Sequence, residues 1–500
     1  MRKVKKLLGL LLAAVMVLAM GVPTFAADEF TITAPDNDHT YEIYQVFTGD
    51  YSEGILSNVK WGKNGIVKAG DPVDNDILNA LAAVNDADDK AQLDVIEDYV
   101  NLDSVAFGTV GKDSEQSLKV PGGYYLIKDK DDSVSGNDSY TLYIVKVVGN
   151  VTITPKSDVP EFEKKVQDIN DSKDNDVSGW QDSADHDIGD MVNFQLKGTV
   201  ADNYDNYEAY KFIFHDRESA GLTFDSSSVK VYVDNALIQS GYQVVTEGLE
   251  DGCTFEIRFA DLKDIPSVHA GSVITVEYQS KLNENAVIGS AGNPNTANLE
   301  FSNNPNDEQG GETGTTPDDT VIVFTFKTII NKKDGENKPL DGAAFQLEKF
   351  VASEEGSDTY NGVKGNWTVI KTIEADDNKT TFEFRGLDDG IYRLTETTTP
   401  AGFNTMDPII FEITAEHEVL VEAGDIPELT NLNGNKVSGE ITFTVSAPDG
   451  SLSADVINQK GSTLPETGGM GTTIFYVLGA ILVLGAGGLL IARRRTDSEK

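Results

Sequence analysis

The sequence predicts a mainly β protein made of tandem immunoglobulin-like β-sandwich domains, with helices added to the first domain and an apolar helix near the C-terminus. Apolar and polar residues alternate through most of the chain, which is the period of a half-buried strand. Turn residues separate these runs at a spacing typical of sandwiches. The chain has 500 residues, 39% of them hydrophobic, which allows about three packed domains between its two ends.

The N-terminal residues 1–26 have the pattern of a secretory signal. Basic residues precede an apolar run over 7–20, and residues 24–26 form a cleavage site, with cleavage expected after Ala26. The mature chain is therefore expected outside the membrane.

The C-terminal region 461–500 combines three elements that act together. A pentapeptide is followed by an uncharged apolar run over 472–492 and then by three arginines. The run is long enough to cross a bilayer as a helix, and the arginines would stay cytoplasmic. This tail resembles the LPxTG cell-wall sorting signal of Gram-positive surface proteins. The resemblance implies that a sortase thiolate attacks the Thr467 carbonyl and releases Gly468 onward. The motif residues are Leu464, Pro465, Glu466, Thr467 and Gly468.

Composition excludes one class of partner and limits the sources of stability. The net charge is −42, so we expect no nucleic-acid binding. Cys253 is the single cysteine, so no internal disulfide can form. A long exported chain without disulfides needs another source of robustness.

Residues 27–156 are predicted to form the first domain. Strand-like runs lie at 30–33, 41–47, 124–128, 140–148 and 151–154. Apolar residues recur at helical spacing over 76–100, and the polar segment 86–90 interrupts them, so two helices are predicted.

Two further domains are predicted at 157–317 and 318–460, both of alternating β segments. In the second, strands are expected at 192–196, 210–214, 229–233, 255–259, 273–278 and 299–303. In the third, strands are expected at 321–330, 344–348, 368–373, 381–384, 391–395, 409–413 and 441–445.

Three polar residues of the third domain share the phase of its core. Lys332, Glu396 and Asn458 each alternate with apolar neighbours and should point inward, whereas Lys333 has the opposite phase. Burying each of them alone is costly. Together they predict an intramolecular Lys332–Asn458 isopeptide bond. Burial would keep the amine neutral and the acid protonated, so that Glu396 assists as the amine attacks and ammonia leaves. A buried salt bridge is the alternative.

The second domain repeats this pattern with an aspartate. Lys164 and Asp216 are in phase with inward apolar residues, and Asn303 is in phase with 299 and 301. We predict a Lys164–Asn303 bond with Asp216 as the acid, and Asn304 is an open alternative. The first domain has no glutamate after its run at 124–128, so no cross-link is predicted there.

The sequence gives little indication of a metal-binding site or an enzyme active site. The segment from Asp174 to Asp185 has an EF-hand-like spacing without flanking helices, so a solvated acidic loop is favoured over calcium. The five histidines show no zinc spacing, and we expect no metal or cofactor. No His-centred triad is evident, so we expect no enzymatic activity.

Four further stretches carry a family resemblance: 271–289, 292–305, 339–345 and 395–404. With them, the whole chain resembles an LPxTG-anchored backbone (major) pilin of Gram-positive bacteria. The resemblance implies a pilin N-terminal domain, a CnaB-like middle domain and a CnaB-type (prealbumin-like) third domain, and it assigns the isopeptide roles to the residues selected by phase. It also implies that Lys156, after Pro155 at the end of the first domain, resolves the acyl-enzyme; Thr154 stands where the family's motif has tyrosine.

The predicted function is therefore structural. A pilus sortase would join Thr467 to Lys156 of the next subunit, and such a head-to-tail contact does not close, so it gives a filament. Expected partners are further copies of the chain, minor pilins, the housekeeping sortase, peptidoglycan and a host surface. A wall-anchored monomeric adhesin that binds host matrix is the alternative, and it would need no acceptor lysine.

Overall fold

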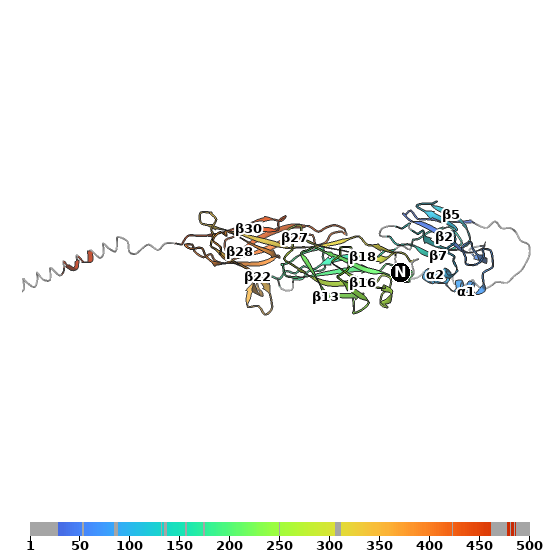
Figure 1. The fold of residues 1–500 in the computed structure, drawn as a ribbon, viewed down its shortest axis with the longest axis horizontal. Helices are drawn as coiled ribbons and strands as arrows, with labels where there is room; N and C mark the ends of the chain where they lie inside the picture. Colours follow the sequence, from blue (N-terminus) through green and yellow to red (C-terminus); the bar gives the residue numbers. More distant parts are fainter. Residues whose placement is uncertain are drawn as a thin grey trace, which may run out of the picture.

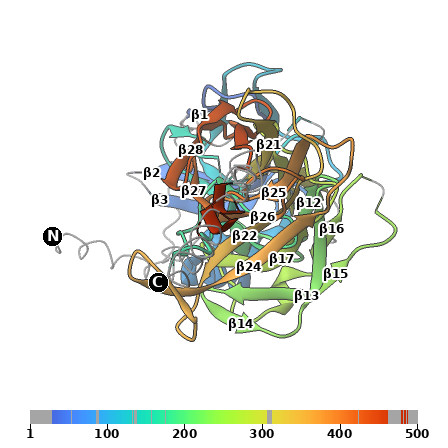
Figure 2. The same cartoon turned by 90° about the vertical axis from the view of Figure 1, so that its left-hand side faces the viewer.

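The computed structural model describes residues 29–52, 55–84, 89–131, 133–134, 138–155, 158–173, 176–249, 251–305, 312–422, 424–461, 478–480, 482–484 and 486. These residues form three β-rich domains that lie end to end along one axis (Figure 1). Figure 2 looks along that axis from the third domain. The predicted secretory signal, Lys156 and the motif 464–468 all lie outside the described residues.

The first domain combines two sheets with two helices. One sheet has the order β5-β1-β8, and the other has the order β3-β2-β6-β7 with β4 also paired to β2. The strands are β1 (Glu29–Thr33), β2 (Thr40–Ser52), β3 (Ile55–Trp61), β4 (Gly108–Gly111), β5 (Ser117–Pro121), β6 (Gly123–Asp129), β7 (Leu142–Val147) and β8 (Val151–Thr152).

The two predicted helices are confirmed as α1 (Asn75–Ala83) and α2 (Asp89–Ile96), followed by the 3-10 turn η1 (Glu97–Tyr99). Their apolar positions include Leu81, Leu93 and Ile96, which are buried in a core with Trp61. The helical period therefore reflects one buried face on each helix.

The second domain is a sandwich of a seven-stranded and a five-stranded sheet around one core. The larger sheet has the order β10-β20-β18-β12-β16-β15 with β19 on β18, and the smaller has the order β14-β13-β17-β11-β9. The elements are β9 (Glu161–Val166), β10 (Ser183–Asp185), β11 (Met191–Thr199), η2 (Tyr204–Asn206), β12 (Phe212–Glu218), β13 (Leu222–Val233), β14 (Ala236–Ile238), β15 (Tyr242–Val245), β16 (Phe255–Phe259), η3 (Leu262–Asp264), β17 (Val273–Leu282), β18 (Asn293–Ser302), β19 (Thr313–Thr315) and β20 (Asp319–Phe324).

The third domain packs the sheet β25-β21-β30-β29 on the sheet β23-β24-β22-β26-β27-β28. Its first strand, β21, and its last, β30, are parallel neighbours, with Lys332 opposite Val456. The strands are β21 (Phe326–Asp334), β22 (Ala344–Ala352), β23 (Asp358–Tyr360), β24 (Val363–Ile373), β25 (Thr381–Leu387), β26 (Gly390–Thr398), β27 (Ile409–His417), β28 (Leu429–Ser438), β29 (Phe443–Ser446) and β30 (Ser451–Asn458).

Strand β20 joins the second and third domains. The sequence boundary at 318 assigned this strand to the third domain, but β20 pairs with β18 and β10 of the second. Val321 and Val323 pack in the second core, whereas Ile322 and Phe324 pack in the third. Because alternate side chains of a strand point to opposite faces, one strand serves both cores.

Beyond residue 461, the structure describes only the short helical pieces 478–480, 482–484 and 486 of the predicted span 472–492. Among the described residues, none of the helices combines the length and apolar character needed to span a bilayer.

Candidate cross-link sites

The third-domain site lies between the first strand, the last strand and β26. Lys332 on β21, Glu396 on β26 and Asn458 on β30 are all buried. Inward phase places them on the core side of their strands, as the sequence predicted. The parallel pairing of β21 with β30 places Lys332 opposite Val456, so Asn458 lies two residues further along the neighbouring strand and on the same face.

Glu396 links the other two side chains of this site. Asn458 Nδ2 donates to both Glu396 oxygens, at 2.8 and 3.0 Å, and Lys332 Nζ lies 3.8 Å from Glu396 Oε1. Asn458 Oδ1 is buried without a hydrogen-bond partner. Burial lowers the pKa of Lys332 to about 8, although Glu396 opposes this shift. About a tenth of the amine is therefore neutral and nucleophilic near pH 7, far more than for an exposed lysine.

The second-domain site holds its lysine more deeply. Lys164 on β9 is fully buried, and its Nζ donates to Asp216 Oδ2 at 2.5 Å and to the Tyr278 hydroxyl at 2.8 Å. The ring centroids of Phe194 and Tyr278 each lie 5.4 Å from Nζ. Burial lowers the pKa of Lys164 against the pull of Asp216, and burial raises the pKa of Asp216. Both shifts favour a neutral amine beside a protonated acid.

The structure does not bring Asn303 to this site, so that choice of asparagine was wrong. Asp216 lies opposite Ala297, and Asn303 lies six residues further along the chain, about 20 Å away in extended conformation. Asn303 instead joins the first two domains: its carbonyl accepts the Tyr140 N–H at 2.6 Å, and its Nδ2 donates to the Asp138 carbonyl at 3.2 Å. The alternative, Asn304, donates to Glu312 at 3.0 Å.

Asn295 occupies the position that was expected of Asn303. It is fully buried, its Nδ2 donates to the Tyr278 hydroxyl at 2.9 Å, and its Oδ1 has no hydrogen-bond partner. The same hydroxyl donates to Asp216 Oδ2 at 2.7 Å. Asn295 has the same strand phase as Asn303, because every second residue of β18 faces the core. Strand phase predicts which face of β18 points into the core, but it does not distinguish between the positions on that face.

The first domain has a different arrangement around its buried lysine. Lys128 Nζ donates to Asp131 Oδ1 at 2.6 Å and to the Asp129 carbonyl at 3.3 Å, and it lies 3.3 Å from Glu42. These groups are two carboxylates and a backbone oxygen. The absence of a cross-link in this domain stays a prediction.

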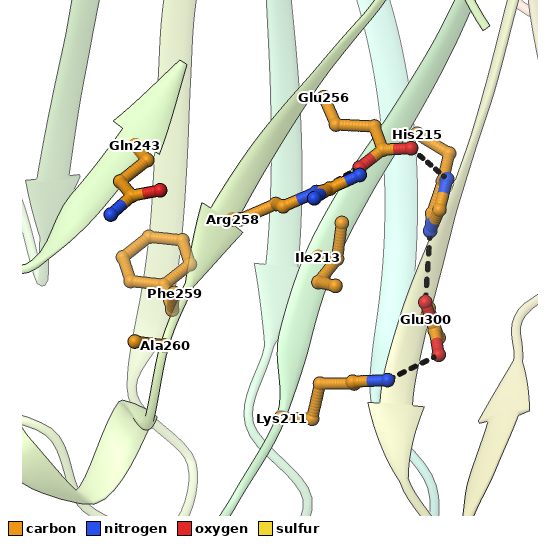
Figure 3. A pocket seen from close by; sticks show the side chains of 9 residues that line it. All are labelled: Lys211, Ile213, His215, Gln243, Glu256, Arg258, Phe259, Ala260 and Glu300. Atoms are coloured by element: carbon orange, nitrogen blue, oxygen red, sulfur yellow. Dashed lines mark hydrogen bonds and ion pairs between the residues drawn. The ribbon is translucent and has the colours of Figure 1, made fainter. Parts of the chain in front are cut away.

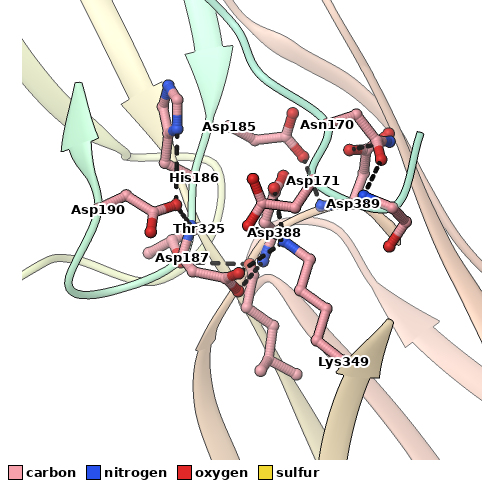
Figure 4. A network of polar contacts seen from close by, with 12 residues as sticks. Asn170, Asp171, Asp185, His186, Asp187, Asp190, Thr325, Lys349, Asp388 and Asp389 are labelled. Atoms are coloured by element: carbon pink, nitrogen blue, oxygen red, sulfur yellow. Dashed lines mark hydrogen bonds and ion pairs between the residues drawn. The ribbon is translucent and has the colours of Figure 1, made fainter. Parts of the chain in front are cut away.

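A fourth buried lysine, which the sequence analysis missed, lies at the junction of the second and third domains (Figure 4). Lys349 on β22 donates to Asp187 at 2.6 Å and to Asp388 at 2.9 Å, and it lies 3.5 Å from Asp171. Burial opposes its charge, but the nearby carboxylates outweigh burial and raise the pKa of Lys349 well above its ordinary value. This lysine is a cation in an ion-pair cluster.

The acidic segment around this junction does not assemble as the EF-hand-like spacing would require. Asp176 lies 3.4 Å from Lys173, and Asp182 contacts Lys165 and accepts the Val421 N–H. Asp185 accepts the Asp389 N–H at 3.1 Å, and Asp174 lies outside the described residues. The described members of the pattern therefore bind separate partners.

Three family models match the chain in the order of these regions. Residues 188–305 match a Gram-positive pilin backbone subunit 2, Cna-B-like domain; residues 326–427 match a prealbumin-like fold domain; and residues 457–498 match an LPXTG cell wall anchor motif. The first two matches cover most of the two domains that contain the Lys164 and Lys332 sites. The third covers the predicted sorting signal.

The chain is also similar to individual proteins. The chain is 24% identical over 403 residues to the trypsin-resistant surface T6 protein of Streptococcus pyogenes serotype M6, covering 69% of this chain and 70% of that protein. Solved structures with a similar arrangement include the T6 backbone pilin of that organism (TM-score 0.48, 15% identity, 87% of this chain and 98% of that chain). Another is the major pilin SpaD of Corynebacterium diphtheriae (TM-score 0.46, 16% identity, 88% and 99%). On the family models and the T6 relative, the chain belongs to the LPXTG-anchored backbone pilins, the cell-wall-anchored major subunits of sortase-assembled pili.

Proposed function

We propose that this pilin is a covalently reinforced shaft subunit, with one intramolecular isopeptide bond in each of its second and third domains. The observation that carries this proposal is the buried Lys332–Glu396–Asn458 cluster, in which a lysine of lowered pKa lies beside an acid that already binds the asparagine amide. The role of such a subunit is mechanical rather than enzymatic.

In the third domain, the neutral Lys332 amine attacks Cγ of Asn458. Glu396 passes a proton from the attacking nitrogen to the departing amide nitrogen, so one C–N bond forms, one breaks and ammonia leaves. Hydrogen bonds from Asn458 Nδ2 to both Glu396 oxygens place the acid at the leaving group. The buried site excludes water, which favours the amide product over hydrolysis.

In the second domain, we propose that Lys164 reacts with Asn295 in place of Asn303, with Asp216 as the acid. The Tyr278 hydroxyl bridges the three groups, since it contacts Lys164 Nζ, Asp216 and Asn295. It thereby holds the carboxamide beside the amine.

Polymerisation is proposed to use Lys156 as the nucleophile and Thr467 as the acyl donor. The residues that flank Lys156 support a position between domains: Ile153 is buried in the first domain, whereas Asp158 accepts the Asp202 N–H of the second at 2.6 Å. A pilus sortase would form the shaft, minor pilins would join it, and a housekeeping sortase would transfer it to peptidoglycan.

The isopeptide bonds are tested by the intact mass of the purified chain. Two bonds lower the mass by two ammonia molecules relative to the sequence. Asn295→Ala and Lys332→Met should each restore one ammonia after correction for the substitution, whereas Asn303→Ala should restore none. An unreduced mass in the wild-type chain would refute both bonds, and a bond lost in Asn303→Ala would return the assignment to that residue.

Polymerisation is tested separately by immunoblotting of boiled wall extracts. A high-mass ladder in the wild type that collapses to monomer in Lys156→Ala would support the proposed linkage. A ladder that survives this substitution would move the nucleophile to another lysine. A monomer in the wild type would instead favour an anchored adhesin.

A further inference from the structure

We propose that the outer face of the second domain holds a four-coordinate site for zinc or a similar transition-metal ion, formed by His215, Asp251, Cys253 and Glu256. One nitrogen, one sulfur and two carboxylate oxygens of these residues all lie within 4.8 Å of one another. These are the donor types that bind Zn²⁺ in proteins.

Two strands and one turn bring the four donors together. His215 on β12 lies directly opposite Glu256 on β16. Asp251 and Cys253 belong to the turn before β16, where Asp251 Oδ1 accepts the Cys253 N–H at 3.1 Å. That bond leaves Asp251 Oδ2 directed at His215 and Cys253. His215 alternates with Phe214 and Asp216, so the site lies on the face of the sheet opposite the Lys164 cluster.

Two of the four printed donor separations are close to the edges of a tetrahedron around a metal, and the two that involve Asp251 Oδ2 are shorter, at hydrogen-bonding distance. His215 Nδ1 lies 3.8 Å from Cys253 Sγ, 3.4 Å from Glu256 Oε1 and 2.7 Å from Asp251 Oδ2, and Asp251 Oδ2 lies 3.0 Å from Sγ. Bonds of about 2.0 Å to N and O and about 2.3 Å to S give edges of about 3.3 Å between N and O donors and about 3.5 Å to S, so Asp251 Oδ2 would have to move away from His215 and Cys253. Small side-chain rotations would therefore admit an ion at the centre.

The contacts around the donors are those that support a metal ligand. His215 Nε2 lies 3.1 Å from Glu300 Oε2, and Glu300 in turn accepts from Lys211 at 3.1 Å (Figure 3). A carboxylate on the far nitrogen fixes the ring and increases the basicity of the ligating nitrogen. Arg258 contacts Glu256 Oε2 and leaves Oε1 free to face His215.

The route from solvent and the types of donor atom indicate which ion the site would bind. A cavity of about 420 Å³ opens beside His215 and Glu256 and gives an ion a route from solvent. A thiolate and an imidazole favour Zn²⁺ over Ca²⁺, which prefers oxygen donors. Binding replaces the Cys253 thiol proton by the metal, so that proton is released.

The test uses the full-length chain in detergent with Co²⁺ as a spectroscopic probe for Zn²⁺. We expect one equivalent of Co²⁺ to give the intense visible bands of four-coordinate cobalt and a thiolate-to-cobalt charge-transfer band. One equivalent of Zn²⁺ should remove both, and excess Ca²⁺ should not. Cys253→Ser should abolish the charge-transfer band, and Glu300→Gln should weaken binding by about 10–100-fold.

The matched control is His269→Gln, which alters an exposed histidine 3.8 Å from Asp234 in the same domain and should leave the spectrum unchanged. A wild-type chain without the charge-transfer band would overturn the proposal, as would a band that persists in Cys253→Ser. Displacement by Ca²⁺ as readily as by Zn²⁺ would also overturn it, because it would indicate oxygen ligation. These readouts do not depend on the isopeptide bonds or on polymerisation.

Discussion

Lys332 and Lys349 lie on different sheets of the same domain, are both buried, and have opposite electrostatic character. Lys332 has one carboxylate beside it, which also binds the Asn458 carboxamide, and burial lowers the pKa of Lys332 to about 8. Lys349 has three carboxylates within 3.5 Å, which raise its pKa despite burial. At these two sites, the single acid beside Lys332 does not offset the effect of burial on its pKa, whereas the three acids around Lys349 do.

The surroundings of Lys349 explain its structural role. Asp187 and Asp171 belong to the second domain, whereas Asp388 follows β25 of the third. The Asp388 N–H also donates to Asp187 Oδ1 at 2.9 Å, and Ser172 Oγ donates to the Phe350 carbonyl at 2.8 Å. The Lys349 cluster therefore joins the two domains without a covalent bond.

Removing the nucleophile should give the largest effect. Lys332→Met should lose the third-domain bond and about 5 kcal/mol of unfolding free energy, because a cross-link that closes a loop of this length restricts the unfolded chain by about that amount. Intact mass and thermal unfolding would measure both changes. Lys333→Ala is the control, since Lys333 pairs with Asp455 on the outer face; an equal loss there would contradict the role of Lys332.

Removing the counter-ion should cost somewhat less. Lys349→Met leaves the buried aspartates without their cation, which typically costs about 3–5 kcal/mol. The number of ammonia molecules lost from the chain should not change. Calorimetry of this variant and of Lys371→Met, an exposed lysine on β24, would separate the effects. Equal unfolding temperatures would argue against a stabilising cluster.

A change of pH should alter the stability of the same junction by a smaller amount than these two substitutions. Burial, with Asp185 and Asp168 nearby, raises the pKa of Asp389 to about 7, and burial beside Asp185 raises that of Asp168 to about 6. The folded chain therefore keeps protons that the unfolded chain releases above about pH 4, so this stabilisation is lost as pH rises to about 7.

The groups that face these two acids are Asp185, His186 and His417 around Asp168, and Lys173 and Asn170 around Asp389. The pKa values of His186 and His417 are also raised. Burial opposes this rise, but contacts with Asp190 and Asp185 outweigh it. The two histidines therefore also make the folded chain less stable as pH rises. The unfolding temperature should fall between pH 4 and 7, and Asp389→Asn should flatten that fall. An unchanged profile would exclude Asp389 as a contributor.

The smallest effect should come from replacing Asp388, one of the acids around Lys349, by asparagine. Asp388→Asn places a carboxamide near a buried lysine, as at Lys332, but Asp187 and Asp171 still hold the amine charged. We expect no loss of ammonia and a stability change within about 1 kcal/mol. A new cross-link in this variant would show that proximity alone is sufficient for the reaction, and intact mass would detect it.

Strand phase predicted much of the fold and the inward orientation of most candidate cross-link residues. Lys332, Glu396, Asn458, Lys164 and Asp216 face inward as expected, because alternation on a strand is a local property of the chain. Phase could not choose Asn295 over Asn303, because the choice depends on the register between β12 and β18. Register is fixed by pairing across the sheet.

Features between domains were harder to predict. Lys349 and Asp187 are separated by 162 residues, and their contact depends on how two domains pack. The boundary at 318 failed for a related reason: β20 has apolar residues on both faces because each face belongs to a different core. A continuous apolar strand is also what a single buried sheet would produce.

The parallel pairing of β21 and β30 determines how tension would pass through the shaft. The chain enters β21 at Phe326 and leaves β30 at Asn458, at the opposite end of the ladder, so a pull loads these strands in shear. With Lys332 joined to Asn458, force would travel from 326 to 332, across the amide and out of the domain. Once the bond has formed, residues 333–457, including the larger sheet, would carry no load. Glu396 would still be needed to form the bond.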